Sequence, residues 1–506
     1  MALVSFDEKA IAIAFGAAIV YCLAIAAYRL FFHPLSTFPG PKLAACTLWY
    51  EFYYDVVLEG QWTFRIQAMH EKYGPIVRIN PHELHIRDPD FYQAIYAPPG
   101  GYNKRNKYQW FYNMAAAPGS IFSTVDHDMH RIRRKPLDNF FSKKAVMDLE
   151  PTIREKVEKL SDRLAKAAEK RAVVRIDCAF MALTMDIICS YCFGSDRKYL
   201  DNDDFGLQWK EVINGAWQKG ALIRAFPWMV AFMSYFPRAL ANKVDPDMGM
   251  FLAWQDSVKD AIKPILDGRN EEKENGARTI FHTLRDSDLP PQERTLERLS
   301  QEGEIFTGAG SETTAKTLTT ILYYLVTHPR CMAKLKDELR VAMPESSKLV
   351  SWTQLEQLPY LTAVIQEGLR LSHGITSRLP RVATESIQYK EWYIPAGTPV
   401  SETIYFVLTD STIFPDPDVF RPERWLDDGD GLRKYQVSFN IGSRQCIGQN
   451  LAYAEMYMAT AALFSRFSFD LHDTTSRNVA MEHDFFVAAP AKQYRGVKAC
   501  VTIDLV

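Results

Sequence analysis

The decapeptide FNIGSRQCIG, close to the C-terminus, places Cys446 between Gly442 and Gly448. Glycine permits tight turns and lets the backbone approach a flat ligand closely. Arg444 can form charge-assisted hydrogen bonds with an anionic group, and Phe439 can shield the cysteine sulfur from water. This arrangement suits a thiolate bound to the iron of haem, with an inert buried cysteine in a glycine-containing loop as the alternative.

The fixed positions of this loop, FxxGxRxCxG, resemble the cysteine loop of the cytochrome P450 enzymes. The resemblance implies a mainly α fold with a small β portion, and a bound haem b (iron protoporphyrin IX) whose iron is ligated by Cys446. In that family the thiolate pushes electron density toward iron and favours cleavage of the O–O bond. Molecular oxygen is therefore the expected co-substrate, and Phe439, Gly442, Arg444 and Gly448 are expected to contact the cofactor.

A second motif lies inside a long helical pattern that spans residues 296–327. Ala309 and Gly310 begin the segment AGSETT, which resembles the family's oxygen-activation motif (A/G)Gx(D/E)T(T/S). By that resemblance Thr313 contacts the oxygen substrate and Glu312 feeds its proton relay, roles that suit a hydroxyl and a carboxylate. Glycine costs a helix interior about 1 kcal/mol, which predicts a helix that opens beside a ligand. A glycine-kinked packing helix is the alternative.

Glu367 and Arg370 are three residues apart and share one helical face. They resemble the ExxR pair of the same family, which Arg424 of the segment FRPERW completes. A carboxylate between two guanidinium groups would lock that segment beneath the haem, so this trio is assigned to structure and haem retention. Trp425 stands where phenylalanine is more frequent in the family, a departure expected to be harmless.

The propionates of haem need cations, and several basic residues match the family's propionate contacts. His130 and Arg134 lie one helical turn apart and align with the family's WxxxR pattern, with histidine in place of tryptophan. Arg381 and Arg444 supply further contacts by the same resemblance. A neighbouring basic surface is either an ordinary solvated face or a docking site for an acidic electron-transfer partner. It comprises Arg131, Arg133, Lys135, Lys143 and Lys144.

The N-terminus predicts a membrane anchor. Residues 10–28 contain no charged side chain, and at about 1.5 Å per residue they approach the roughly 30 Å hydrocarbon core. The predicted division is a short luminal N-terminus (1–9), a transmembrane helix (10–30), a proline-rich hinge (31–42) and a haem-thiolate catalytic domain (43–506). The positive bias after the segment favours a single-pass protein of the endoplasmic reticulum membrane with a cytosolic catalytic domain. A cleaved signal peptide is the alternative.

Composition argues against several other classes. The formal net charge of −2 over 506 residues gives no reason to expect a nucleic-acid partner. The eight cysteines are scattered through the chain and are interpreted as reduced. Cys189 and Cys192 have the CxxC spacing of redox or zinc sites, but they lie in an apolar run without a second such pair, and helix packing is the favoured interpretation.

Hydrophobic patterns predict a helix-dominated domain with a small sheet at one end. Two strands at residues 75–79 and 83–87 are expected to form a hairpin, and further strands are expected at 386–393, at 398–400 and near the C-terminus. Long helices are expected over residues 151–170, 179–191, 254–263, 296–327, 330–341 and 358–371.

Signals for the substrate are weaker. Family members contact substrate at positions that correspond here to Phe122, Phe306, Ala309, Ile375 and Phe486. These side chains imply an apolar, lipophilic small molecule. The aromatic residues between 215 and 236 are either plain core or an apolar lip of the pocket that touches the lipid bilayer.

Together these features predict a haem-thiolate monooxygenase that inserts one atom of O2 into a terpenoid or polyketide-like metabolite. The sequence resembles fungal secondary-metabolism members of the family, including those similar to trichodiene oxygenase. No flavin or nicotinamide domain is visible, so electrons are expected from an NADPH-cytochrome P450 reductase, with cytochrome b5 as a further donor. Two alternatives stay open: an oxygen-independent isomerase or dehydratase, or a peroxygenase, on the same fold, and a haem-binding sensor or scaffold without turnover.

Overall fold

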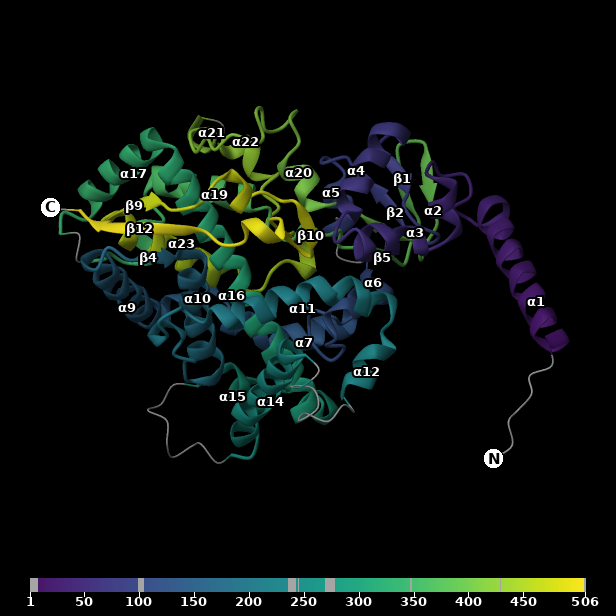
Figure 1. Ribbon diagram of the computed structural model, residues 1–506, viewed down its shortest axis with the longest axis horizontal. Helices are drawn as coiled ribbons and strands as arrows, with labels where there is room; N and C mark the ends of the chain where they lie inside the picture. The colour runs from purple at the N-terminus through teal and green to yellow at the C-terminus, as the bar shows by residue number, and fades with distance from the viewer. Residues whose placement is uncertain are drawn as a thin grey trace.

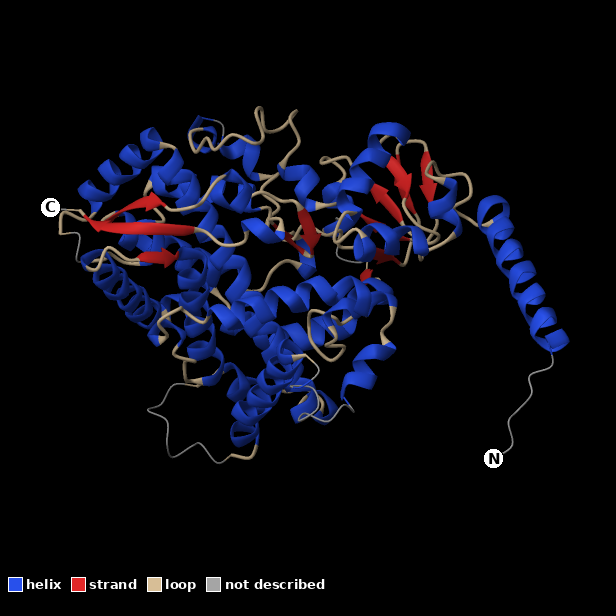
Figure 2. Ribbon diagram, in the orientation of Figure 1, coloured by secondary structure: helices blue, strands red, loops and turns tan. Residues whose placement is uncertain are grey.

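The computed structural model describes residues 8–98, 104–234, 243, 245–268, 278–345, 348–427 and 429–504. Figure 1 shows one large body from which the N-terminal helix α1 (Glu8–Ala27) projects, and Figure 2 shows that helices dominate this body. The mainly α fold with a small β portion is therefore confirmed.

The helices after α1 are short at first and lengthen toward the middle of the chain. They are α2 Lys42–Cys46, α3 Trp49–Phe52, α4 Trp62–Tyr73, α5 Tyr92–Tyr96, α6 Gln109–Tyr112, α7 His127–Phe140, α8 Lys143–Asp148, α9 Glu150–Glu169, α10 Ile176–Phe193, α11 Leu207–Ala225 and α12 Trp228–Ser234. The later helices are α14 Pro246–Leu266, α15 Ile280–Arg285, α16 Leu296–Thr327, α17 Pro329–Ala342, α18 Trp352–Leu355, α19 Pro359–Ser372, α20 Ile404–Leu408, α21 Arg424–Asp427, α22 Gly429–Arg433 and α23 Gln449–Phe464. The long helices predicted from the sequence are all present, whereas α4, α11 and α23 were not predicted.

The centre of the body is α16, which packs against α10, α14, α19 and α23. Its glycines permit this packing. A Cβ added at Gly310 would lie 3.0 Å from Ile188 of α10, and one at Gly303 would lie 2.8 Å from Val258 of α14. The expectation that this helix opens beside a ligand is wrong, because α16 is continuous from Leu296 to Thr327. Gly303 and Gly310 serve close helix contacts, whereas a Cβ at Gly308 would meet nothing within 4 Å.

The strands are short and form small sheets. Their bounds are β1 Ile76–Arg78, β2 Leu84–Ile86, β3 Arg105–Lys107, β4 Val173–Arg175, β5 Arg381–Ala383, β6 Ile387–Tyr389, β7 Trp392–Ile394, β8 Pro399–Ser401, β9 Phe467–Leu471, β10 His483–Phe485, β11 Val487–Ala489 and β12 Lys498–Ile503. The largest sheet has the strand order β1-β2-β8-β5-β3, and a second has the order β4-β12-β9. The predicted β1–β2 hairpin is confirmed, with Ile76 opposite Ile86. The single strand predicted at 386–393 is instead the β6–β7 hairpin, because Lys390 adopts a φ of 50° and turns the chain.

The N-terminal helix has the properties of a membrane span. α1 continues as a π-helical turn over Tyr28–Phe32. The apolar stretch Ala12–Phe32 has 21 residues and a mean hydropathy of 1.9, and none of it is buried in the protein. It is long enough to cross a bilayer. The equally apolar helix α10 is largely buried and forms part of the core. Cys189 and Cys192 lie there as buried thiols, as the packing interpretation predicts.

The connector after the anchor is fixed to the first hairpin. The guanidinium of Arg78 in β1 donates hydrogen bonds to the carbonyls of Arg29 (2.8 Å) and Pro81 (2.9 Å). The Arg78 N–H also donates to the Pro39 carbonyl (2.7 Å). A Cβ at Gly40 would lie 2.4 Å from the Arg78 oxygen, so the backbones touch only because residue 40 is glycine.

Candidate functional site

Cys446 lies between the 3₁₀ turn Gly442–Arg444 and α23, in a loop closed by a hydrogen bond from its N–H to the Phe439 carbonyl (2.9 Å). Burial raises the pKa of the Cys446 thiol, and the Gly448 N–H bonded to the sulfur opposes that shift. The side chain is nevertheless accessible. The sulfur therefore lies deep in the protein but faces a space instead of packed neighbours. Phe439 packs on Tyr453, with ring centroids 5.2 Å apart.

The two glycines of the loop have different roles. Gly442 has a φ of +78°, and a Cβ there would lie 2.3 Å from the Tyr96 carbonyl and 3.0 Å from the Ala97 Cβ. The backbone at Gly442 thus lies directly against the end of α5. Gly448 precedes α23, and a Cβ there would meet only the Cys446 sulfur, at 4.0 Å.

Basic side chains gather near one end of the largest sheet. Lys107 of β3 lies opposite Arg381 of β5 in the strand register. Burial, with the charges of Arg381, Arg444 and Arg134, holds the pKa of Lys107 well below its usual range. Burial and the neighbouring Arg381 lower the pKa of Arg444 to about 9. Burial and the same group of cations hold the pKa of His130 well below its usual range, so this imidazole is neutral. Motif matching missed Lys107, because no family pattern includes it.

Among the described residues the buried cations of this cluster form no ion pair, whereas the more exposed Arg134 pairs with Asp138 (2.8 Å). Arg444 donates to the carbonyls of Thr124 (2.6 Å) and Val125 (2.8 Å), and Arg381 donates to the Tyr112 hydroxyl (2.7 Å). In the part of the chain that the structure describes, three buried nitrogens of this cluster have no partner: His130 Nδ1, Arg381 Nε and Arg444 Nε. Uncompensated buried charge is costly, so the cluster fits a ligand that brings its own carboxylates, as haem does. Arg134 donates to the Gln445 carbonyl (2.8 Å), which ties α7 to the cysteine loop.

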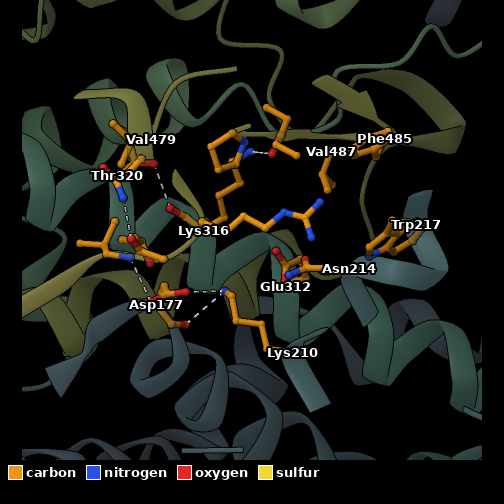
Figure 3. A pocket seen from close by; sticks show the side chains of 18 of the residues that line it. Asp177, Lys210, Asn214, Trp217, Glu312, Lys316, Thr320, Val479, Phe485 and Val487 are labelled. Atoms are coloured by element: carbon orange, nitrogen blue, oxygen red, sulfur yellow. Dashed lines mark hydrogen bonds and ion pairs between the residues drawn. The ribbon is translucent and has the colours of Figure 1, made fainter. Parts of the chain in front are cut away.

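Thr313 and Glu312 are neighbours on α16, but their side chains face different surroundings. The Thr313 hydroxyl donates to the Ala309 carbonyl (2.8 Å). Ala309 is accessible although it lies in the middle of a largely buried helix. Glu312 is buried and lines a cavity with Lys210 of α11 and Lys316 (Figure 3). Within the described residues its Oε2 has no hydrogen-bond partner.

Glu367 is fully buried at the centre of a network of donors. Arg370 donates to both of its oxygens, Nε to Oε2 (2.9 Å) and Nη2 to Oε1 (2.8 Å), and Arg424 Nε donates to Oε1 (3.1 Å). The two arginines also donate to backbone carbonyls within residues 415–419. Trp425 Nε1 donates to Oε2 as well (2.9 Å). The tryptophan at position 425 therefore adds a hydrogen bond that phenylalanine could not make, because phenylalanine has no N–H.

The structure brings together part of the predicted substrate-contact set. Phe486 stacks on Trp217 with centroids 5.3 Å apart and meets the edge of Phe122 at 5.6 Å. Ile375 packs on the same aromatic cluster. Phe306 does not join them and is buried in the helical core. Phe486 has a φ of 74°, an uncommon and costly conformation for a bulky residue.

In its described part, residues 215–234, the aromatic segment contains both core and exposed side chains, and Phe236 lies outside the described residues. Trp217 belongs to the internal cluster, whereas Trp228 and Phe232 of α12 are exposed. Trp49 of α3 is exposed as well and lies 6.3 Å from Phe226, centroid to centroid. These apolar side chains form an exposed patch over α3 and α12.

The predicted basic docking surface is only partly available. Arg133 is half-buried and holds Glu293 through two hydrogen bonds (2.7 and 3.1 Å). Lys143 pairs with Glu356 (2.5 Å). Arg133 therefore stabilises the fold and is wrongly included in that surface. The exposed members are Arg131, Lys135, Lys143 and Lys144, and of these Lys143 is engaged by Glu356.

A helical body built around α16, with an accessible cysteine in a loop bonded to α7 and a buried group of cations, suits a protein that holds haem through a cysteine. The sequence matches the cytochrome P450 family over residues 39–495, and the chain belongs to that family.

Similar proteins come from fungi. The chain is 43% identical to cytochrome P450 monooxygenase MO6277 of Ascocoryne sarcoides, over 96% of this chain and 97% of that protein. It is 41% identical to cytochrome P450 monooxygenase TRI4 of Trichoderma arundinaceum, over 95% and 93% of the two chains. It is also 40% identical to tryptophan 6-hydroxylase fscE of Fusarium equiseti, over 96% and 95%. The resemblance to fungal members predicted from the sequence is confirmed.

Proposed function

We propose that this protein is a membrane-anchored haem-thiolate monooxygenase that inserts one atom of O2 into a terpenoid or polyketide-like metabolite. One observation carries the proposal: the accessible Cys446 lies in a loop joined to a buried cluster of cations through Arg134. Cys446 would supply a thiolate for iron, and the cations would pair with the haem propionates. Two relatives named as monooxygenases, at 43% and 41% identity, support the reaction class.

The residues that would hold haem b are Cys446 as iron ligand and, around the propionates, Lys107, His130, Arg134, Arg381 and Arg444. When bound, the haem supplies the activation of O2. The Gly448 N–H stabilises the thiolate form of Cys446 by donating to the sulfur. The Thr313 hydroxyl donates to Ala309 at rest and can rotate to donate a proton toward the reacting oxygen. Glu312, the preceding residue and about 100° around the helix, would resupply that proton.

The apolar cluster around Phe486 supports a lipophilic substrate. Phe122, Trp217, Ile375 and Phe486 offer apolar and aromatic surface with few polar groups to recognise. The apolar patch over α3 and α12 would lie against the bilayer beside an anchor at 10–30 and a hinge at 31–42. A lipophilic molecule could then pass from the membrane to a catalytic domain at 43–506 that faces the cytosol from the endoplasmic reticulum.

Electrons come in this proposal from an NADPH-cytochrome P450 reductase, with cytochrome b5 as a further donor. The docking surface consists of the exposed residues Arg131, Lys135 and Lys144, on or next to α7. α7 is bonded to the cysteine loop through Arg134 and Gln445, so a partner there would be close to the thiolate side of the haem.

The test is the difference spectrum of the dithionite-reduced protein with and without carbon monoxide. We expect a strongly red-shifted Soret band that Cys446→Ala abolishes and that the control Cys500→Ala, in half-buried β12, retains. A band typical of histidine-ligated haem in the wild type would refute thiolate ligation. Product formation from candidate terpenoids that requires both O2 and reductase would exclude the isomerase, dehydratase and peroxygenase alternatives, and any turnover would exclude the scaffold.

A further inference from the structure

A cavity of about 90 Å³, lined by charged and by apolar side chains, lies beside α16 on the side of Glu312 (Figure 3). Glu312 and Lys316 of α16 line it, with Lys210 of α11 and Asp177 of α10. A water molecule needs at least about 10–15 Å³ of such space and polar partners, so the cavity has room for several. Half-buried side chains at its edge connect it to the protein surface: Asn214, Gln218, Asn478 and Arg495.

The two lysines of this cavity differ in their partners. Lys210 forms an ion pair with Asp177 at 3.3 Å, which holds α11 against α10, and it also faces Glu312 in the cavity. Lys316 donates to the backbone carbonyl of Ala488, a neutral acceptor. Lys316 also follows Glu312 by four residues, so both side chains lie on one face of α16. Among the described residues Glu312 Oε2 has no partner, and cavity water is the remaining group that can bridge it to Lys316.

Lys316 has the chemistry of a group that exchanges protons near neutral pH. Burial lowers its pKa to about 7, against the opposing charge of Glu312, while Lys210 lowers the pKa further and Asp484 raises it. An amine with this pKa is partly charged and partly neutral at pH 7, which is the condition for efficient proton transfer in both directions. The charged or titratable groups that face it from the packed elements are Asp177, Lys210, Glu312, His373, Asp484 and Arg495.

We propose that Lys316 supplies protons to Glu312 through the water of this cavity, and thereby recharges the relay of the proposed monooxygenase. The proton leaves the Lys316 ammonium, crosses a bridging water and reaches the Glu312 carboxylate, which gives a neutral amine and a carboxylic acid. The amine then takes a proton from water that enters past the edge of the cavity. Lys316 acts through Glu312 and touches neither substrate nor cofactor. This inference rests on the proposed function.

The first test needs no turnover. Competitive acetylation of the full-length protein across a pH series, read by mass spectrometry, gives a titration midpoint for each lysine. We expect Lys316 to titrate near pH 7, and Glu312→Gln to lower that midpoint because a negative neighbour is lost. Lys492, exposed in the neighbouring turn Lys492–Tyr494, is the control, and its acetylation profile should be the same in both proteins. A Lys316 midpoint above 9, or one that Glu312→Gln leaves unchanged, would overturn the proposal.

The second test compares Lys316→Met, Lys316→Arg and the control Lys492→Met in the haem-loaded protein with reductase, NADPH and O2. We expect both Lys316 variants to form about tenfold less oxygenated product per NADPH and more hydrogen peroxide, with an unchanged carbon monoxide spectrum. In the wild type this yield should fall as pH rises through 7, and in the variants it should not respond. A structural or purely electrostatic role would leave Lys316→Arg like the wild type, which would overturn the proposal. Absence of the thiolate spectrum in the wild type would instead refute the proposed function. The acetylation midpoints would still decide whether Lys316 titrates as proposed.

Discussion

Replacement of Trp425 by phenylalanine removes one donor from the buried carboxylate of Glu367. The indole Nε1 lies 2.9 Å from Oε2, and the same oxygen keeps Arg370 Nε at 2.9 Å, so the carboxylate is not left unpaired. A hydrogen bond to a charged group contributes about 1.5–3 kcal/mol, and the remaining donor places this loss at the lower end. The smaller phenylalanine ring also buries less apolar surface against Phe414, whose ring centroid is 5.9 Å from that of Trp425. This lost burial costs about 1 kcal/mol. We expect the free energy of unfolding to fall by about 2–3 kcal/mol.

The assay is urea unfolding followed by far-ultraviolet circular dichroism and by haem absorbance. Trp425→Phe should lower the midpoint without changing the slope, since the same surface is exposed on unfolding. The control is Trp49→Phe, a site that is 62% exposed, where a change within about 0.5 kcal/mol is expected. Equal midpoints for the two variants would refute the reasoning and show that the indole N–H contributes nothing measurable to the Glu367 network.

Other perturbations test separate parts of the structure. Gly442→Ala should abolish haem retention, measured by absorbance after gel filtration, because its Cβ would lie 2.3 Å from the Tyr96 carbonyl. Stability should fall as pH drops from about 6.5 to 4. Burial lowers the pKa of His70 to about 4, so the unfolded chain takes up that proton first; urea midpoints at pH 7.5 and 5 measure this, and His70→Gln should weaken the dependence. Reversing the charge of Arg131 and Lys135 should slow reduction by the reductase at low salt and flatten its salt dependence, and unchanged salt dependence would contradict docking there.

The sequence predicted those parts of the fold that depend on local periodicity. The apolar pattern of residues 296–327 predicts the bounds of α16, because a long helix repeats its buried positions every three to four residues. Pairing between distant strands has no such local signal. Lys107 meets Arg381 only through the β3–β5 register, across more than half of the chain, so this buried cation of the cluster was missed.

The site residues show the same contrast between local sequence signals and contacts between distant segments. Motif positions identified the partners of Glu367, whose spacing on α19 sets their geometry. Side chains outside the motifs depend on what packs opposite them. Phe306 occupies a motif-adjacent position on α16 yet is buried in the helical core, and Arg133 is next to Arg134 but turns toward Glu293. Successive residues of a helix differ by about 100° in direction, so adjacency in sequence does not imply a shared site.

That same rotation explains the unusual composition of the segment AGSETTAK in α16. Ala309 and Thr313 are four residues apart and share one face, where the hydroxyl bonds to the Ala309 carbonyl. Glu312 and Lys316 are also four apart and share another face, which lines the cavity. Gly310 points in a third direction, where a side chain would press on α10. The segment therefore combines three kinds of residue. Gly310 admits the neighbouring helix α10, Thr313 presents a hydroxyl, and Glu312 and Lys316 place an acid and a base at the cavity. Alanine at Gly310 would press on α10, and alanine at Thr313 would remove the hydroxyl, although alanine favours helix at both positions.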